Sequence, residues 1–520
     1  MLSRRLARWF HGALAIERGL PLSRRAFLGG VGVGALGMAA CTTTRRPARD
    51  DGPVDDRRPR VAILGAGLAG LTCLHELRKH GIDAVCYERA ERVGGRVKTA
   101  RDLFAEVTGA PHHIELGGEF IDSDHTELLA LVNELGLTVR DLTGNPAPED
   151  AVARERVYWA DGQRVDELDL MTGFVPVAHA IIEARQRMGA DDVDYRSTSA
   201  AARRYDETPL AEFLAAAGPS AAARKVLDAA YTAEYGVAAG QQSALNLIMM
   251  LSDDNLAESA GADLWALFGD SDERWQVEGG NDQVATRIAA RHASRIRLGC
   301  VVEQLAEKAG GGWRIALAGG REVDAEVVVC TIPFSVLRHV PIRAELSDTK
   351  RRAIAELGYG NNAKLVLPFS TRPWERAGDD GTIYADLELQ TTWAPDAWAK
   401  GAGGVLTNFV GGSRGFSITD GTTAEQARRL AADLERIWPG AAEAARVDQA
   451  LRQLWLDEPG ALGSYAAYLI GQWTTIAGAE PEPVGTLLFA GEHTSADFQG
   501  YMGGAVQSGV RAAKDVLALV

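Results

Sequence analysis

The chain has 520 residues, of which 46% are hydrophobic and 24% are charged, and its formal net charge is −15. This length predicts roughly two to four domains, and the composition, with a mean hydropathy of −0.10, excludes both a mainly disordered chain and a polytopic membrane protein. The acidic isoelectric point of about 5.3 argues against nucleic acid as a partner and permits cationic ligands.

Residues 1–40 have the order of an export signal. Two adjacent arginines, Arg24 and Arg25, precede a glycine-rich apolar run that ends at Ala40. Basic, then apolar, then small residues predict a secretory signal, and the paired arginines indicate the twin-arginine export machinery as a partner. Removal of residues 1–40, with six arginines and one glutamate, changes the net charge from −15 to about −20. We therefore expect an exported, periplasmic protein.

Cys41 follows the predicted signal directly. It lies where a bacterial lipoprotein carries its acylated cysteine, although Met38 is atypical at the first position of that motif. Two alternatives stay open, a lipid anchor at Cys41 and an ordinary cleavage site near Ala40. Residues 41–59 are polar and contain three prolines, which predicts a tether.

Residues 60–88 have the pattern of a dinucleotide-binding βαβ unit. A short apolar run is followed by Gly65, Gly67 and Gly70, then by leucines at helical spacing and by a second apolar run. In such a unit the first glycine permits the tight turn, the second lets the backbone approach a pyrophosphate, and the third lets helix and strand pack closely. The helix N-terminus adds free N–H groups for the phosphates, and Glu88 is placed to accept a hydrogen bond from a ribose hydroxyl.

FAD and NAD both bind at this kind of glycine turn, so the turn alone does not distinguish them. The stretch after the unit does. It carries Gly94, Gly95 and Arg96, and here the sequence resembles the flavin-containing amine oxidase family, which includes monoamine and polyamine oxidases and L-amino acid oxidases. Gly95 allows close approach, and Arg96 adds a permanently ionised fork near the pyrophosphate. The resemblance recurs in order along nearly the whole chain after the tether, at residues 115–121, 275–280, 302–305, 327–333, 357–369, 487–493 and 500–505.

The resemblance implies an α/β fold of the glutathione reductase type, in which a Rossmann-like FAD-binding domain is interleaved with an α+β substrate domain. FAD is expected without a covalent link, because Ser464 stands where covalently flavinylated relatives have a cysteine. The FAD-binding domain would take residues 58–130, 270–345 and 455–520, and the substrate domain residues 131–269 and 346–454. The residues expected to bind FAD are Gly65, Gly67, Ala69, Gly70, Glu88, Arg89, Gly95, Arg96, Gly117, Gly118, Glu119, Val302, Glu492 and Met502.

The resemblance also implies the chemistry. In the family, an amine gives a hydride equivalent to the flavin, the imine product hydrolyses, and oxygen usually reoxidises the flavin to give hydrogen peroxide. Lys364 matches the family's lysine that holds a water near the reactive nitrogen, and Tyr465 and Tyr501 match the two aromatic residues that flank the substrate nitrogen. Apolar and aromatic walls favour the neutral amine, because they make the cation costly to desolvate.

The substrate is less narrowly defined. The stretch with Glu119 and Asp122 is acidic and lacks the arginine that L-amino acid oxidases need. These carboxylates are candidates to hold the distal ammonium of a diamine or polyamine. The alternative is that they belong to a solvated loop. Trp393 is a candidate for the pocket wall. The leading prediction is an exported FAD-dependent oxidase of primary amines, diamines or polyamines. The alternatives are an L-amino acid oxidase that uses an arginine such as Arg203 or Arg274, an amine dehydrogenase that passes electrons to a periplasmic carrier, and a flavin-binding electron-transfer or sensor protein.

The cysteines and histidines do not predict a metal site. The adjacent histidines His112 and His113 have no other ligand nearby in sequence. No CxxC motif is present, so we expect buried thiols rather than disulfides or metal ligands at the four cysteines after the tether, Cys73, Cys86, Cys300 and Cys330.

Overall fold

The computed structural model describes residues 13, 60–142, 154–189, 192–250, 272–395 and 400–520. The predicted signal, the candidate lipid attachment at Cys41 and the tether lie outside these residues, apart from Ala13, and stay predictions. In the described part of the chain, no helix is both long and apolar enough to cross a membrane.

The first layer is a parallel five-stranded sheet with the strand order β20-β13-β1-β2-β9. Every residue of β1, β2, β13 and β20 is buried, because other elements cover both faces of the sheet. The predicted βαβ unit is confirmed, with α3 (Leu68–Lys79) as its helix. The strands are β1 (Val61–Leu64), β2 (Ala84–Tyr87), β9 (Ile296–Arg297), β13 (Val327–Cys330) and β20 (Leu487–Phe489).

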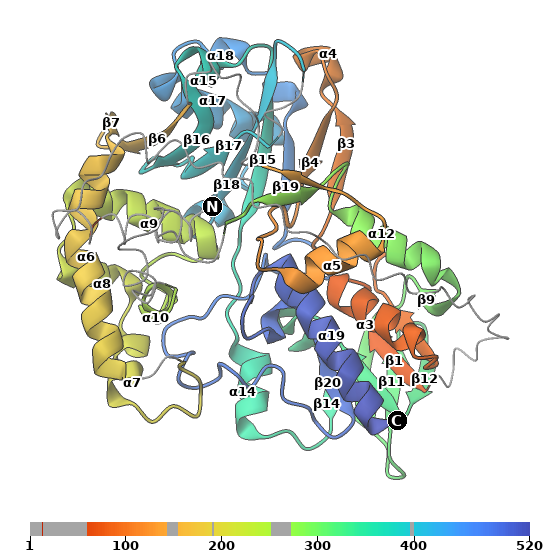
Figure 1. Cartoon of the computed structure of the whole chain (residues 1–520). Coiled ribbons are helices and arrows are strands. Elements are labelled where there is room, and N and C mark those ends of the chain that lie inside the picture. The colour runs from red at the N-terminus through yellow and green to blue at the C-terminus, as the bar shows by residue number, and fades with distance from the viewer. Residues whose placement is uncertain (1–12, 14–59, 143–153, 190–191, 251–271, 396–399) are drawn as a thin grey trace, which may run out of the picture.

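One face of this sheet is covered by helices. Val61 and Ile63 of β1 point to this face and share a core with α3, α5 (Thr126–Glu134), α12 (Asp282–Arg291) and α19 (Met502–Leu519). Figure 1 shows α19 lying along α3 in front of the sheet. Side chains alternate along a strand, so Ala62 and Leu64 point to the opposite face.

That opposite face packs on a four-stranded sheet with the order β12-β11-β10-β14. Trp313 of β11 is fully buried at the centre of this contact. The strands are β10 (Val302–Glu307), β11 (Trp313–Leu317), β12 (Arg321–Ala325) and β14 (Ile342–Arg343). Two helices, α13 (Phe334–Leu337) and α14 (Asp348–Glu356), complete this side.

A seven-stranded sheet lies above the parallel sheet in Figure 1 and has the order β19-β15-β18-β17-β16-β6-β7. The strands are β6 (Glu155–Ala160), β7 (Gln163–Val165), β15 (Ala363–Phe369), β16 (Asp379–Ala385), β17 (Thr391–Trp393), β18 (Gly404–Val410) and β19 (Leu451–Leu454). Its core includes residues of α15 (Pro373–Arg376), α17 (Thr423–Ile437) and α18 (Ala441–Ala444), and α16 (Gly412–Ser417) follows β18.

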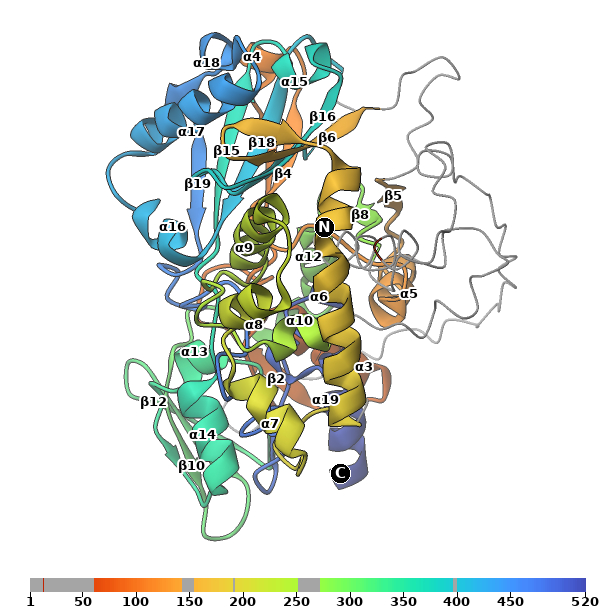
Figure 2. The same ribbon diagram turned by 90° about the vertical axis from the view of Figure 1, so that its left-hand side faces the viewer.

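A group of helices continues from this sheet toward the parallel sheet. Figure 2 shows the long helix α6 running down one side, with α7 to α10 beside it. Tyr158 and Tyr384 of the seven-stranded sheet belong to the same core. The helices are α6 (Glu167–Met188), α7 (Ala200–Glu207), α8 (Leu210–Ala217), α9 (Ala221–Tyr235) and α10 (Leu245–Ile248).

Both large sheets are assembled from segments that are distant in sequence. The parallel sheet uses strands from 61–87, 296–330 and 487–489, and the seven-stranded sheet uses strands from 155–165, 363–410 and 451–454. This interleaving is the expected α/β architecture, while the domain limits themselves stay a prediction. The remaining elements are β3 (Thr99–Leu103), α4 (Ala105–Thr108), β4 (His112–Glu115), β5 (Val139–Asp141), β8 (Trp275–Val277), and the short 3₁₀ turns at Ala293–Arg295, Val447–Gln449 and Glu492–Thr494.

Candidate active site

A cavity of about 850 Å³ lies at the carboxyl ends of the parallel strands and extends to the seven-stranded sheet. Ligands of open α/β sheets bind at this edge, because the loops after the strands converge there. The structure brings most of the predicted site residues onto the cavity wall. They are Gly65, Gly67, Ala69, Glu88, Arg89, Gly95, Arg96, Gly117, Gly118, Glu119, Val302, Lys364, Trp393, Tyr465, Glu492, Tyr501 and Met502.

The glycines of the first turn have different surroundings. Gly65 has a φ of +110°, and a Cβ there would lie 2.5 Å from Thr331 Oγ1. A Cβ on Gly70 would lie 2.0 Å from the carbonyl oxygen of Gly65, so Gly70 lies beneath the turn and does not line the cavity. A Cβ on Gly67 would meet no atom within 4 Å, because this glycine faces the cavity. Gly70 thus has the packing role that the pattern predicts for the third glycine, and it is not among the residues of the cavity wall.

The N-terminus of α3 is open to the cavity. Its N-cap residue, Gly67, has no side chain to accept hydrogen bonds from the first backbone N–H groups. Such groups bind anions and carry the positive end of the helix dipole. The open space beside Gly67 and these N–H groups fit a pyrophosphate.

Glu88 shapes the loops that surround this turn. Its carboxylate accepts hydrogen bonds from the backbone N–H of Ala66, at 2.7 Å, and of Ala90, at 2.8 Å. The side chain thus joins the glycine turn after β1 to the loop after β2, at the position expected for a ribose contact.

Arg96 and Glu492 join three distant segments at the cavity wall. Arg96 Nη1 donates to Glu492 Oε1 at 2.9 Å and to the carbonyl oxygen of Ser464 at 2.8 Å. The second oxygen of Glu492 accepts from the backbone N–H of Gly500 at 2.8 Å. Arg92, which the sequence reasoning did not select, also lines the cavity and donates to the carbonyl oxygen of Gly95 at 2.6 Å.

The segment with Gly117 and Gly118 is tightly enclosed. A Cβ on Gly117 would lie 1.9 Å from the carbonyl oxygen of Arg96, and a Cβ on Gly118 would lie 2.8 Å from Cγ of Met502. Met502 begins α19, and its N-cap residue, Tyr501, provides no side-chain cap. The free N–H groups of α19 would therefore be available to stabilise the negative charge of a reduced flavin bound beside them.

Lys364 lies on β15, and its side chain is buried. Its Nζ donates to the carbonyl oxygens of Glu115, at 2.8 Å, and Gly117, at 2.9 Å, and to Glu119 Oε2 at 2.7 Å. The other carboxylate oxygen of Glu119 accepts from Trp393 Nε1 at 2.9 Å. Lys364, Glu119 and Trp393 therefore form one buried cluster on the cavity wall.

The two predicted tyrosines also line the cavity. The hydroxyl of Tyr465 donates to the carbonyl oxygen of Glu234, and burial raises the pKa of Tyr465 well above its usual value, so it stays neutral. The ring of Tyr501 lies 5.6 Å from that of His125. These placements fit the aromatic positions expected at the substrate nitrogen, and the roles of both tyrosines stay a prediction.

Another part of the wall was not selected from the sequence. It comes from the C-terminal end of α9, from Met250 after α10 and from the seven-stranded sheet, and no local motif marks it. Only the burial pattern of β16 and β18 could have suggested that some of these side chains face inward. These residues include Ala230, Ala233, Glu234, Tyr235, Met250, Tyr384, Thr391 and Phe409.

Asp122 does not line the cavity, so its predicted contact with the substrate is corrected. Its side chain is buried, its Oδ1 accepts from the backbone N–H of Glu273, and its own N–H donates to His125 Nδ1 at 3.1 Å. Asp122 is therefore engaged in closing a turn. The acidic pattern alone could not distinguish this use from a ligand contact.

The arginines of the amino acid oxidase alternative also lie elsewhere. Arg203 is exposed on α7. Arg274 pairs with Asp141, at 2.6 Å. Neither of them lines the cavity.

The four cysteines are buried free thiols, as expected. Burial raises the pKa of the Cys330 thiol to about 12, which makes this group unreactive. Cys300 is different in that it lines the cavity, where its sulfur accepts from Arg321 Nη2 at 3.3 Å.

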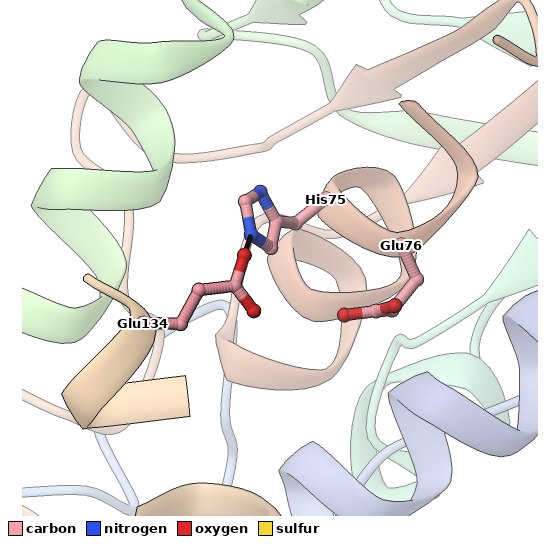
Figure 3. A group of neighbouring side chains, drawn as sticks. All are labelled: His75, Glu76 and Glu134. Atoms are coloured by element: carbon pink, nitrogen blue, oxygen red, sulfur yellow. Dashed lines mark hydrogen bonds and ion pairs between the residues drawn. The ribbon is translucent and has the colours of Figure 1, made fainter. Parts of the chain in front are cut away.

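In the described residues, two clusters of imidazole and carboxylate groups bring possible metal ligands close together. In the first, Figure 3 shows His75 pointing to Glu134, with Glu76 beside them. Lys79 Nζ donates to Glu76 and to Glu134, at 2.7 Å each. The ammonium group of Lys79 therefore occupies the position that a metal ion would take between the two carboxylates.

The second cluster contains Asp122, Asp124 and His125. His125 Nδ1 accepts a backbone N–H, so the proton of the neutral ring lies on Nε2, which cannot then bind a metal. The adjacent histidines of β4 do not converge either, because His112 is buried and His113 is exposed on opposite faces of the strand.

Comparison with known proteins agrees with this geometry. Residues 68–517 match the model of a family described as flavin containing amine oxidoreductase. Nicotine dehydrogenase of Pseudomonas putida (strain DSM 28022 / S16) is 23% identical over 516 residues, covering 96% of this chain and 98% of the relative. Flavin-dependent L-tryptophan oxidase RebO of Lentzea aerocolonigenes is 26% identical over 490 residues, covering 88% of this chain and 98% of the relative. The structure of putrescine oxidase bound to putrescine has the same fold, with a TM-score of 0.72 and 23% identity, over 89% of this chain and 99% of that chain.

The family match spans far more than half of the chain and includes nearly every segment that builds the cavity. The open turn at Gly67 and the two uncapped helix N-termini independently fit the phosphates and the ring of FAD. The chain therefore belongs to the flavin-containing amine oxidoreductase family and is a flavin-dependent oxidoreductase that acts on amines, with non-covalently bound FAD as its cofactor.

Proposed function

We propose that the protein is an exported amine oxidase that converts a primary amine, diamine or polyamine to an imine, which water hydrolyses to an aldehyde or ketone. Bound FAD would supply the acceptor for the hydride equivalent that leaves the amine carbon, while a proton leaves the amine nitrogen, and oxygen would take up the two electrons and two protons as hydrogen peroxide. The chain itself binds and orients the amine in the cavity and excludes water from it.

One observation carries this choice of substrate. The arginines on the cavity wall, Arg89, Arg92 and Arg96, all come from the segment after β2, beside the phosphate turn. In the described residues, the wall that α9 and strands β16 to β18 form is aromatic and apolar, with the carboxylate Glu234 and no arginine. A substrate carboxylate would have no guanidinium partner there, whereas an amine would find aromatic faces and a carboxylate.

A substrate panel tests the proposal. The FAD-loaded protein is incubated with aliphatic diamines, polyamines, aromatic monoamines and L-amino acids, and the peroxide formed is measured. We expect turnover of amines and none of L-amino acids, so exclusive turnover of L-amino acids would overturn the proposal. Nicotine and putrescine belong in the panel, because similar proteins are named for these compounds.

A second measurement separates the oxidase from an amine dehydrogenase, a function that the name of the similar nicotine dehydrogenase favours. We expect about one peroxide per amine oxidised in air. A much lower ratio, with full turnover restored by an artificial electron acceptor, would favour transfer to a periplasmic carrier instead.

Export through the twin-arginine machinery is part of the proposal, with a lipid anchor at Cys41 or cleavage near Ala40 as its two outcomes. The paired arginines Arg24 and Arg25 support it. The double variant Arg24→Lys, Arg25→Lys should accumulate unprocessed in the cytoplasm, and complete processing would exclude this route. The mass of the mature N-terminus distinguishes an acylated Cys41 from a free one.

A further inference from the structure

The hydrogen bonds of Lys364 define its protonation state. Three acceptors surround Nζ, namely the carbonyl oxygens of Glu115 and Gly117 and the carboxylate of Glu119, at 2.7 to 2.9 Å. A neutral amine has only two N–H donors, whereas an ammonium has three. Lys364 is therefore an ammonium ion, and the protein already uses all three of its protons.

Glu119 is the matching anion. One of its oxygens accepts from Lys364, and the other accepts from Trp393 Nε1 at 2.9 Å. Lys364 is 4% exposed and Glu119 is 5% exposed, so each charge lies largely out of water and is stabilised by the other. The two side chains form a buried ion pair without net charge on the wall of the flavin cavity.

We propose that Glu119 is a positioning residue for the flavin reaction, which anchors Lys364 to the backbone and cancels its positive charge beside the cofactor. The inference rests on the proposed flavin site. A reduced flavin carries negative charge at neutral pH, so an uncompensated ammonium nearby would stabilise it and raise the reduction potential. The ion pair with Glu119 keeps that potential lower.

Sulfite is a probe of this charge that needs no amine turnover. The lone pair of the sulfite sulfur forms a bond to the reactive flavin nitrogen, and negative charge passes to the ring, so nearby positive charge strengthens the adduct. The dissociation constant is read from bleaching of the flavin absorption at one fixed pH. The reduction potential of the bound flavin is measured on the same samples.

Glu119→Gln leaves Lys364 without its counter-ion. We expect its sulfite dissociation constant to fall by about tenfold or more and its reduction potential to rise. Two matched variants keep the net charge of the pair at positions 119 and 364 at zero. Their sulfite dissociation constants should stay within about twofold of the wild-type value. Trp393→Phe removes only the Nε1 hydrogen bond to Glu119, and the double variant Glu119→Gln, Lys364→Met removes both charges.

Each outcome decides one question. Wild-type protein that holds no FAD or oxidises no amine would contradict the proposed function. An FAD-loaded Glu119→Gln variant with the sulfite affinity and reduction potential of the wild type would overturn only the role of Glu119. The same conclusion would follow if the double variant bound sulfite as tightly as Glu119→Gln does. If Glu119→Gln does not retain FAD, Glu119→Ser makes the same change in charge and leaves room for water beside Trp393, and the same comparisons decide.

Discussion

At the scale of single residues, two glycines of one turn have opposite constraints. Gly67 has an ordinary φ of −72°, and a Cβ there would enter only the cavity, whereas a Cβ on Gly70 would collide with the backbone of Gly65 at 2.0 Å. The first glycine therefore serves the ligand and the second serves the packing of α3 against β1.

Gly67→Ala should leave the apoprotein folded but weaken FAD binding by about tenfold or more, because the methyl group occupies the space that a pyrophosphate needs. Gly70→Ala should lower the free energy of unfolding by about 2 kcal/mol, since the helix must move away. FAD content after purification and the melting temperature of the apoprotein measure the two effects. Wild-type FAD affinity in Gly67→Ala would place the cofactor elsewhere.

Glu115 makes stability depend on pH. Burial raises the pKa of its carboxyl from 4.5 to about 7, although hydrogen bonds from Asn281 and Thr99 oppose the shift. Between these two pH values the folded chain binds a proton that the unfolded chain has released, so this stabilising contribution is complete below 4.5 and is lost as the pH rises through about 7.

Glu115→Gln mimics the protonated carboxyl and removes this loss. The variant should match the wild type at about pH 5 and exceed its free energy of unfolding at about pH 8 by on the order of 2 kcal/mol. Denaturant unfolding at both pH values measures the difference. An equal difference at both values would mean that Glu115 does not titrate in this window.

At the scale of elements, a chain of hydrogen bonds ties three helices together. His75 of α3 bonds through Nε2 to Glu134 of α5, at 2.8 Å, and through Nδ1 to His292, directly after α12, at 2.9 Å (Figure 3 shows the first contact). Lys79 also pairs with Glu134 at 2.7 Å. The helices that cover the parallel sheet are thus held by polar contacts at one end as well as by their apolar core.

The contribution of the His75–His292 hydrogen bond to stability should decrease in acid. Burial lowers the pKa of His292 from 6.5 to about 4, and the nearby His75, Arg78, Arg291 and Lys79 act in the same direction. The unfolded chain therefore binds the extra proton between these two values, so stability falls as the pH decreases from 6.5 to about 4. In His292→Gln this decrease should be smaller by on the order of 1 kcal/mol, as measured by denaturant unfolding across the window. An unchanged slope would show that His292 does not contribute to it.

Elements with a local signature could be predicted from the sequence. The buried strands β1 and β2 follow from short apolar runs, and α19 begins at Met502, within the family segment at residues 500–505. The partner of Lys364 could not be predicted in the same way, because Glu119 is 245 residues away and the two meet only through tertiary packing. For the same reason the acidic stretch after Gly118 gave no means of separating Glu119, on the cavity wall, from Asp122, which is outside it.

At the scale of the whole molecule, the cavity is where the two large sheets meet. Its wall combines the loops after the parallel strands with Lys364 of β15 and Phe409 of β18, both in the seven-stranded sheet. Arg96, Ser464 and Glu492 connect these parts through hydrogen bonds across more than 360 residues of sequence. A ligand that fills this cavity contacts every layer at once, so its binding should stabilise the molecule as a whole.

FAD should therefore raise the melting temperature of the apoprotein in a concentration-dependent way. Because FAD binds only the folded chain, a hundredfold excess over its dissociation constant adds about 2.7 kcal/mol to the free energy of unfolding. Thermal scans of apoprotein at increasing FAD concentrations measure the shift, and Gly67→Ala is the matched control, since its apoprotein keeps the fold while its phosphate turn is blocked. The control should need about tenfold more FAD for the same shift. Equal shifts in both proteins would mean that FAD stabilises the chain from a site that does not include the turn at Gly67.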